Sequence, residues 1–156
     1  MIQIFSGIFL LSGMVFASAP AHAQNVETPY WASISDEKAN ARVGPTRDYR
    51  IAWVYQRKNL PVKVLKRYES WRQIEDHDGD VSWMLASLLS RKRTAVVIDG
   101  IQKMHAEPES ASKVIWRVEP GVVGVLGSCS NNYCEFDIDG QSGYVAAAGL
   151  WGVGKP

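Results

Sequence analysis

The sequence contains an internal repeat with a period of about sixty residues, which limits the folds open to the chain. Trp53 recurs as Trp116, and at the same offset Arg42–Pro45 recurs as His105–Pro108. Such a period indicates two copies of one small unit, spanning about residues 28–98 and 99–153. Further matches at slightly shorter offsets join Leu60–Leu65 to Gly121–Leu126, Trp71–Ile74 to Tyr133–Phe136 and Trp83–Met84 to Tyr144–Val145.

Each copy has the pattern of a string of short strands. Leu60, Val62 and Val64 form an alternating run, with Lys63 and Lys66 on the other side. Asp78-Gly79 is the strongest signal for a two-residue hairpin turn, and it is repeated at Asp139-Gly140. Strands this short have to curl into a small closed barrel to protect their edges. The sequence therefore predicts an all-β fold of two tandem barrels. The expected strands are 31–34, 39–42, 51–55, 60–64, 71–75, 81–85 and 94–98 in the first copy, and 114–118, 122–126, 133–137 and 144–145 in the second. A short helical turn is expected over 86–89.

The N-terminal segment 1–23 carries no Lys, Arg, Asp or Glu and contains a modest apolar run. It ends in Ala21-His22-Ala23, a small-x-small triplet that suits signal peptidase. We expect an N-terminal signal peptide at 1–23 that is cleaved, with the first barrel at 24–98 and the second at 99–156. An uncleaved anchor is the alternative, but glycines and serines make the run polar for a membrane span. The prediction is a periplasmic or secreted protein with no stable membrane insertion after cleavage.

Both cysteines, Cys129 and Cys134, fall in the exported part of the chain, where nearby thiols oxidise. The turn-prone pair Asn131-Asn132 lies between them and favours a hairpin that brings them face to face. Two cysteines make only half of a zinc site, and the histidines supply no second ligand pair at a recognised spacing. The sequence predicts a disulfide, and neither a metal nor a cofactor.

The formal charge of +1 excludes a global field that would attract nucleic acid. The charge is nevertheless uneven, because residues 24–98 hold 13 basic and 9 acidic side chains, and residues 99–156 hold 4 and 7. A basic first copy is suited to anionic polymers of the envelope. The joint at Asp99-Gly100 is too short for a flexible linker, so the two copies are expected to touch.

The residues give little support for catalysis. A disulfide leaves no thiolate for a cysteine nucleophile, and Gly127-Ser128-Cys129 does not fit a nucleophile elbow. The acidic clusters Asp76–Asp80 and Asp137–Gly140 occupy the same hairpin position, where turns themselves favour Asp and Gly. We expect a protein that is not an enzyme.

Residues 28–98 resemble bacterial SH3-like domains. The second copy, which ends in Gly149–Val153, is similar to the degenerate partner that often follows such a domain. The resemblance implies two SH3-like barrels in a cell-envelope protein without enzymatic activity. His105 stands where Arg42 does, so a role of that arginine is expected only in the first copy. The resemblance is carried by Asn40–Pro45, Trp53–Tyr55, Leu60–Val62, Trp71, Asp78-Gly79, Trp83, Leu88–Ser90 and Arg93-Thr94.

The aromatic side chains of the first copy are divided between core and surface. Trp53 and Trp83 lie in apolar strands and are expected in the core. Tyr49, Tyr55 and Trp71 flank loops, where a ring either packs in the core or stacks on a peptide or sugar.

Arg42 begins the loop that contains Gly44 and Pro45. The segment is either simply a rigid loop start or a guanidinium fork for a carboxylate of a wall peptide. The candidate ligand-binding residues are Arg42, Tyr49, Tyr55 and Trp71.

These features predict a non-catalytic binding module of the cell envelope. Its expected partner is a cell-wall peptide or glycan-peptide of peptidoglycan, recognised by aromatic and basic residues of the first barrel. The alternative is a structural adaptor that joins other envelope proteins and binds no small ligand. Nucleic acid is not an expected partner, because export removes the target and the basic residues form no recognised motif.

Overall fold

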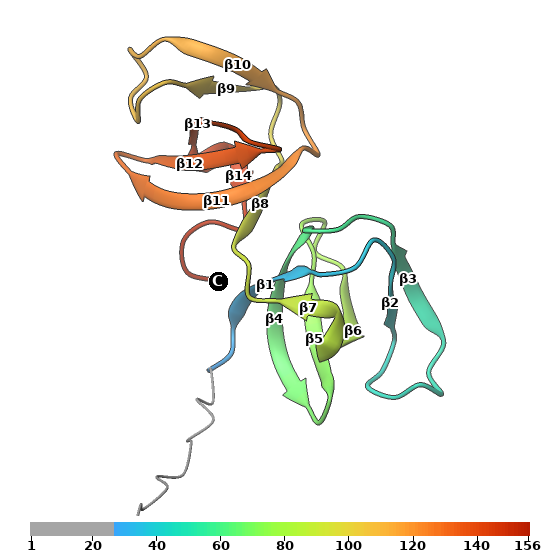
Figure 1. Cartoon of the computed structure of the whole chain (residues 1–156). Helices are drawn as coiled ribbons and strands as arrows, with labels where there is room; N and C mark the ends of the chain where they lie inside the picture. Colours follow the sequence, from blue (N-terminus) through green and yellow to red (C-terminus); the bar gives the residue numbers. More distant parts are fainter. Residues whose placement is uncertain (1–26) are drawn as a thin grey trace, which may run out of the picture.

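The computed structural model describes residues 27–156, and the predicted signal segment 1–23 lies outside them. Over this range the backbone forms two seven-stranded antiparallel sheets, one after the other in the chain (Figure 1). Each curls into a small barrel, which confirms the predicted all-β tandem fold. In the described part, helix is limited to the short 3-10 turns η1 (Ala86–Leu88) and η2 (Ala147–Gly149), and neither could cross a membrane.

The first barrel has the strand order β3-β2-β6-β5-β4-β1-β7. The predicted strands of this barrel, those between residues 31 and 85, are confirmed within a few residues at each end, as is the short helical turn. Its strands are β1 (Tyr30–Ile34), β2 (Ala39–Arg42), β3 (Ile51–Tyr55), β4 (Pro61–Tyr68), β5 (Trp71–Glu75), β6 (Val81–Leu85) and β7 (Leu89–Ser90).

The second barrel repeats the same topology in the order β10-β9-β13-β12-β11-β8-β14. Each position in this order has its counterpart in the first sheet, so the internal repeat is confirmed at the level of strand pairing. The strands are β8 (Thr94–Val97), β9 (Gln102–His105), β10 (Val114–Val118), β11 (Val123–Ser130), β12 (Tyr133–Ile138), β13 (Gln141–Ala146) and β14 (Leu150–Trp151).

The prediction that a strand at 94–98 closes the first barrel is wrong. β8 pairs with β11 and β14, so it is the first strand of the second sheet. The short strand β7 closes the first sheet instead, by pairing with β1. The boundary between the barrels therefore lies at residues 91–93, between β7 and β8, rather than after residue 98.

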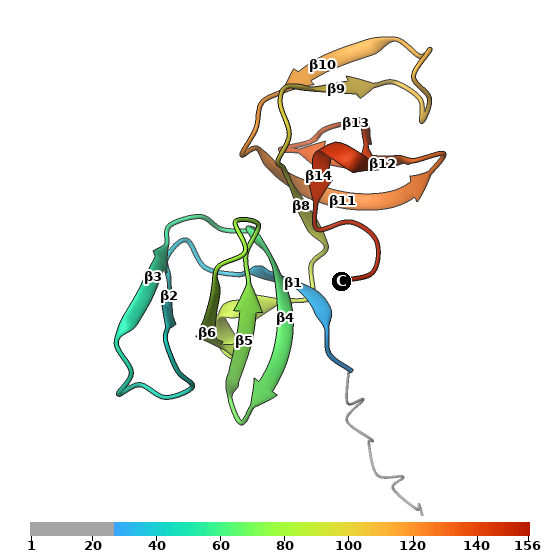
Figure 2. The ribbon, with the colours of Figure 1, turned by 180° about the vertical axis from the view of Figure 1, so that it is seen from behind.

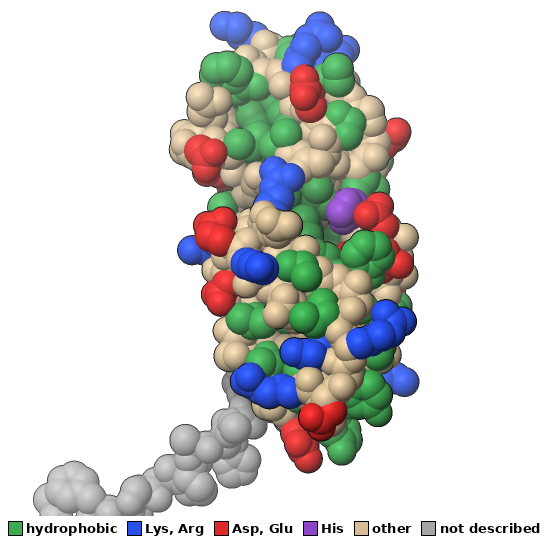
Figure 3. Space-filling view, turned by 90° about the vertical axis from the view of Figure 1, so that its right-hand side faces the viewer, with side chains coloured by type: hydrophobic (Ala, Val, Ile, Leu, Met, Phe, Trp, Pro, Cys, Tyr) green, Lys and Arg blue, Asp and Glu red, His purple; other side chains and the backbone are tan. Residues whose placement is uncertain are grey.

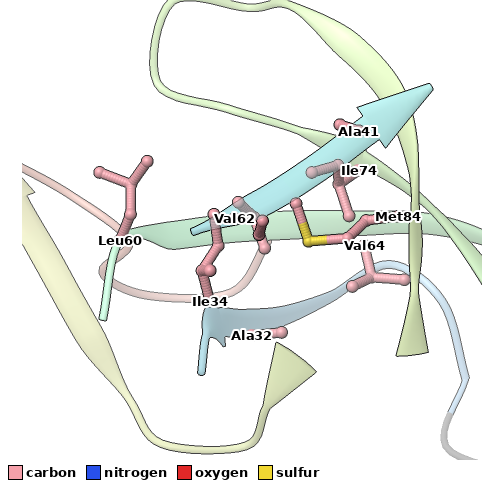
Figure 4. Packing of buried hydrophobic residues seen from close by; sticks show 9 residues of the cluster. Ala32, Ile34, Ala41, Leu60, Val62, Val64, Ile74 and Met84 are labelled. Atoms are coloured by element: carbon pink, nitrogen blue, oxygen red, sulfur yellow. The ribbon is translucent and has the colours of Figure 1, made fainter. Parts of the chain in front are cut away.

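Alternation along the strands builds each core. In β4, Val62 and Val64 are fully buried, whereas Lys63 between them points outward and pairs with Glu75 at 2.8 Å. Figure 4 shows these valines packed against residues from β1, β2, β5 and β6. The buried residues of the first core are Ala32, Ile34, Ala39, Ala41, Leu60, Val62, Val64, Ile74 and Met84. Those of the second are Ala95, Val97, Met104, Val118, Leu126, Cys134, Phe136, Val145 and Leu150.

The two Asp-Gly turns differ in length. Asp139-Gly140 joins the paired residues Ile138 and Gln141 as a two-residue turn, with φ of 52° and 86°. The Ser142 hydroxyl and the Gly140 N–H bond to Asp137 and lower the pKa of that carboxyl. The predicted two-residue turn at Asp78-Gly79 is wrong, because the last strand pair there is Glu75 with Val81, which leaves a five-residue loop.

The predicted disulfide is confirmed. Cys129 and Cys134 lie directly opposite each other on β11 and β12 and are bonded. Asn131 and Asn132 form the turn between these strands with φ of 50° and 64°, a conformation that Asn tolerates better than most residues. The bond fixes the register of this hairpin.

The two barrels touch, as expected from the short joint. The rings of Trp31 in β1 and Trp151 in β14 meet edge to face with centroids 4.7 Å apart, and the Trp31 Nε1–H donates to the Gly154 carbonyl. The Arg57 guanidinium donates to the carbonyl of Gly121 in the second barrel. Val123 of β11 packs against the core of the first barrel. In both ribbon views the C-terminal end of the chain lies beside β1, between the barrels (Figure 1 and Figure 2).

Candidate functional site

A hollow of about 210 Å³ lies on the first barrel where β2, the loop 43–50, the start of β5 and the end of β6 meet. Its lining combines apolar side chains with three cations and one amide, and it contains no Asp or Glu. The lining residues are Lys38, Asn40, Arg42, Arg47, Trp71, Leu85 and Leu88.

Arg42 is held in place by its own loop. Its guanidinium Nη1 donates to the carbonyl of Tyr49 across the loop that it begins. Tyr49 in turn lies over Gly44, because a Cβ added at residue 44 would come within 2.6 Å of the Tyr49 ring. The glycine is therefore needed here for the close approach of the ring. Arginine carries five N–H donors, so donors remain for a ligand after one is used on the loop.

The structure brings together two of the four predicted binding residues. Arg42 and Trp71 line the same hollow, although Trp71 is only 6% exposed and presents little more than an edge. Tyr49 is 46% exposed and lies over the loop without lining the hollow.

Tyr55, the fourth predicted residue, packs against the core of the first barrel. Its hydroxyl donates to Asp76 Oδ2 at 2.8 Å, and Asp76 Oδ1 accepts the N–H groups of Asp78 and Asp80. Burial, and then the bond to Asp76, raise the pKa of Tyr55 far above its usual value. Tyr55 thus organises the Asp78-Gly79 loop and lies away from the hollow.

A buried histidine takes the place of Arg42 on the second barrel. His105 occupies the position of Arg42, since Arg42 pairs with Trp83 and His105 with the equivalent Tyr144. The His105 ring is buried, its Nδ1–H donates to the Ser112 carbonyl, and it packs edge to face on Tyr133, the counterpart of Trp71. The guanidinium of the first hollow therefore has no equivalent at this position of the second barrel, where the histidine is packed inside.

Two tryptophans that are expected in the core lie elsewhere. Trp83 in β6 is only half-buried, between the buried residues Ser82 and Met84, and is not part of the first core. Trp53 is expected in the core, whereas it is 49% exposed on β3, the terminal strand of its sheet. Trp116 on β10 is its counterpart, since Trp53 pairs with Ala41 and Trp116 with Met104, and it is 50% exposed. The repeat itself is the signal that could have found this pair, because it places both tryptophans on equivalent strands.

No metal centre is formed by the described residues, since no group of three His, Cys, Asp or Glu side chains within 27–156 could hold an ion. The bonded cysteines offer no thiolate. The side chains that line the hollow offer positive charge, one amide and apolar surface.

Comparison with known proteins identifies the family of this sequence. The bacterial SH3 domain family matches the sequence twice, over residues 35–91 and 99–152, which correspond to the two barrels. The chain belongs to the bacterial SH3 domain family. Both of its SH3 modules are thus recognised independently, including the second one that the sequence marked as degenerate.

Solved structures give a weaker likeness. NlpC1 from Trichomonas vaginalis is 11% identical, with a TM-score of 0.37, 82% of this chain covered and 47% of that one. NlpC2 from the same organism is 12% identical, with a TM-score of 0.36 and coverages of 81% and 49%. This chain spans about half the length of both proteins. No curated protein matches the sequence.

Proposed function

We propose that this protein is a non-catalytic binding module of the cell envelope, exported to the periplasm or beyond, whose first SH3 module binds a carboxylate-bearing cell-wall peptide. The observation that carries this proposal is the hollow in which Lys38, Arg42 and Arg47 surround an apolar floor with no acidic side chain. Three unopposed cations attract a carboxylate, and arginine holds it through two parallel hydrogen bonds.

The apolar part of the hollow suits the rest of such a peptide. Trp71, Leu85 and Leu88 form a small apolar wall next to the cations. A volume of about 210 Å³ lies below the range typical of drug-sized ligands, so the hollow fits one or two residues rather than a whole polymer repeat. The proposed ligand is therefore the free end of a short peptide, with a terminal carboxylate beside Arg42.

The test is co-sedimentation of the full chain with purified peptidoglycan. Arg42→Ala is expected to weaken binding by about tenfold or more, because a charged hydrogen bond contributes roughly 1.5–3 kcal/mol. Arg50→Ala is the matched control: it removes an exposed arginine of the same loop that does not line the hollow, and it should leave binding unchanged.

The salt dependence of binding distinguishes a formed site from nonspecific charge attraction. Exposed charges are largely screened at moderate ionic strength, whereas hydrogen bonds in a partly closed site persist. Binding that vanishes in moderate salt, or that falls equally in Arg42→Ala and Arg50→Ala, would contradict the proposal. A chain that does not sediment at all but captures envelope proteins would point to the adaptor function instead.

A further inference from the structure

The second SH3 module contains a larger hollow at a different place. It has a volume of about 300 Å³ and lies where the end of β10 faces the turn between β12 and β13. Figure 3 shows hydrophobic side chains gathered within the upper module, which is the second one, with charged side chains around them. The hollow has an apolar floor and a polar rim. The lining residues are Met104, Trp116, Arg117, Val118, Glu119, Val122, Ile138 and Gln141.

In the first module, side chains of the module itself fill the place that corresponds to this hollow. By strand register Val118 corresponds to Tyr55, since Val118 pairs with Gln102 and Tyr55 with the equivalent Ala39. Ile138, the last residue of β12, corresponds to Asp76, because each comes directly after an equivalent strand pair, Asp137 with Ser142 and Glu75 with Val81. The Tyr55–Asp76 pair of the first module thus becomes Val118 and Ile138 in the second. The change from a phenol ring to an isopropyl group leaves a space of ring size, without the carboxylate that binds a hydroxyl.

The hollow also runs along a free strand edge. β10 is the terminal strand of its sheet and, among the described residues, pairs with β9 alone. The last three residues of β10, 116–118, and Glu119, which follows them, line the hollow in succession. Successive side chains of a strand point to opposite faces, so a hollow that touches four in a row lies beside the strand edge and its main chain.

We propose that the second SH3 module binds an extended peptide segment that adds to β10 as a further strand and inserts an aromatic side chain into this hollow. Main-chain hydrogen bonds to a sheet edge give affinity in such complexes, and pockets for alternate side chains give specificity. Here the ring takes the space between Val118 and Ile138, and Trp116 loses exposed surface to the bound segment.

Charged residues at the end of β10 determine the direction of the bound peptide and the residues that flank its aromatic side chain. Arg117 and Glu119 lie two residues apart, so they project on the same side of the chain and flank Val118. On an antiparallel partner the residue opposite Glu119 comes first, then the one opposite Val118, then the one opposite Arg117. A basic residue, an aromatic residue and an acidic residue in that order complement the site.

This inference goes beyond the proposed function, since it uses another module, another hollow and an apolar rather than an anionic ligand group. The two can also fail separately. Arg42→Ala should weaken the first activity by about tenfold or more and leave this one intact.

The experiment titrates the isotope-labelled full chain with acetyl-Thr-Lys-Phe-Glu-Thr-amide and follows backbone amide shifts. We expect shifts at residues 116–119, 138 and 141. The same peptide with Ala in place of Phe should bind at least about tenfold more weakly, because a buried ring contributes roughly 1.5–3 kcal/mol. Exchange of Lys and Glu in the peptide should also weaken binding.

Substitutions test whether the peptide binds in this hollow. Val118→Tyr with Ile138→Asp rebuilds the pair of the first module, so it should keep the fold, as judged by thermal unfolding, and lose peptide binding. Trp116→Ala should weaken binding, whereas Trp53→Ala, the matched change in the first module, should not. No shifts, equal affinity for the Phe and Ala peptides, shifts confined to residues 38–47, or full binding by the folded double variant would each overturn the proposal.

Discussion

At the scale of single residues, the hydroxyl of Tyr55 joins the core of the first module to the loop that follows β5. It donates to Asp76, whose other oxygen holds two backbone N–H groups of that loop. We expect Tyr55→Phe to lower the free energy of unfolding by about 1–2 kcal/mol, since it leaves a buried carboxylate oxygen without its donor. Denaturant unfolding measures this. Tyr49→Phe changes an exposed ring and should stay within about 0.5 kcal/mol.

The same hydroxyl predicts an alkaline limit to stability. The pKa of Tyr55 in the folded chain is raised far above that of the unfolded chain, about 10. Its contribution is fully present below pH 10 and is lost as the pH rises, because the unfolded chain ionises first. The slope approaches about 1.4 kcal/mol per pH unit. The stability gap between the wild type and Tyr55→Phe should therefore narrow above pH 10, and a constant gap would contradict the assignment.

Which aromatic ring meets solvent is decided at this scale, and the sequence predicts it only in part. Trp53 lies among the apolar residues of β3 and is expected in the core, whereas Trp71 begins β5 next to a loop and is left open between core and surface. Trp53 is exposed because β3 is a terminal strand, and Trp71 is buried because β5 lies inside the sheet. Strand position within a sheet depends on pairing between distant segments, which periodicity does not encode. Gly44 and Pro45 mark the loop that follows Arg42, and the structure places Arg42 at the end of β2 before that loop; its role in binding stays a prediction.

At the scale of elements, the Cys129–Cys134 hairpin is a local clamp. The bond closes a loop of only six residues, so reduction should cost about 2 kcal/mol by the chain-entropy relation. Unfolding with and without reductant measures the loss, and Cys129→Ala with Cys134→Ala should reproduce it. Ligand binding by the first module should be unchanged in this variant. A loss of first-module binding on reduction would contradict this prediction, because it would show that the disulfide stabilises structure outside its own hairpin.

Strands with a strong alternating pattern are the most predictable elements. β4 and β5 follow directly from their apolar spacing, and the repeat transfers them to β11 and β12. β9 is not predicted, because Gln102–His105 contains no β-branched residue and is a strand only through its partners β10 and β13. β8 is predicted in the wrong barrel, since the apolar run Ala95–Val97 suits any buried strand position.

At the scale of the whole molecule, the modules are joined by aromatic packing. Trp151→Ala removes a ring that meets Trp31 edge to face, and Val123 of the second module covers part of the first core. We expect the variant to lose about 2 kcal/mol and to unfold in two separated steps, where the wild type unfolds in one. Calorimetry distinguishes the two. Trp53→Ala, an exposed tryptophan away from the joint, should keep a single transition.

The joint between Trp31 and Trp151 also has a geometric consequence. One proposed site lies on each module, and because the barrels contact each other through these rings the distance between the two hollows is fixed. A partner long enough to reach both has to carry its acidic end and its aromatic ring at that spacing. The two proposals together predict that the protein selects ligands by length, because two weak contacts give high affinity only when one ligand spans both sites.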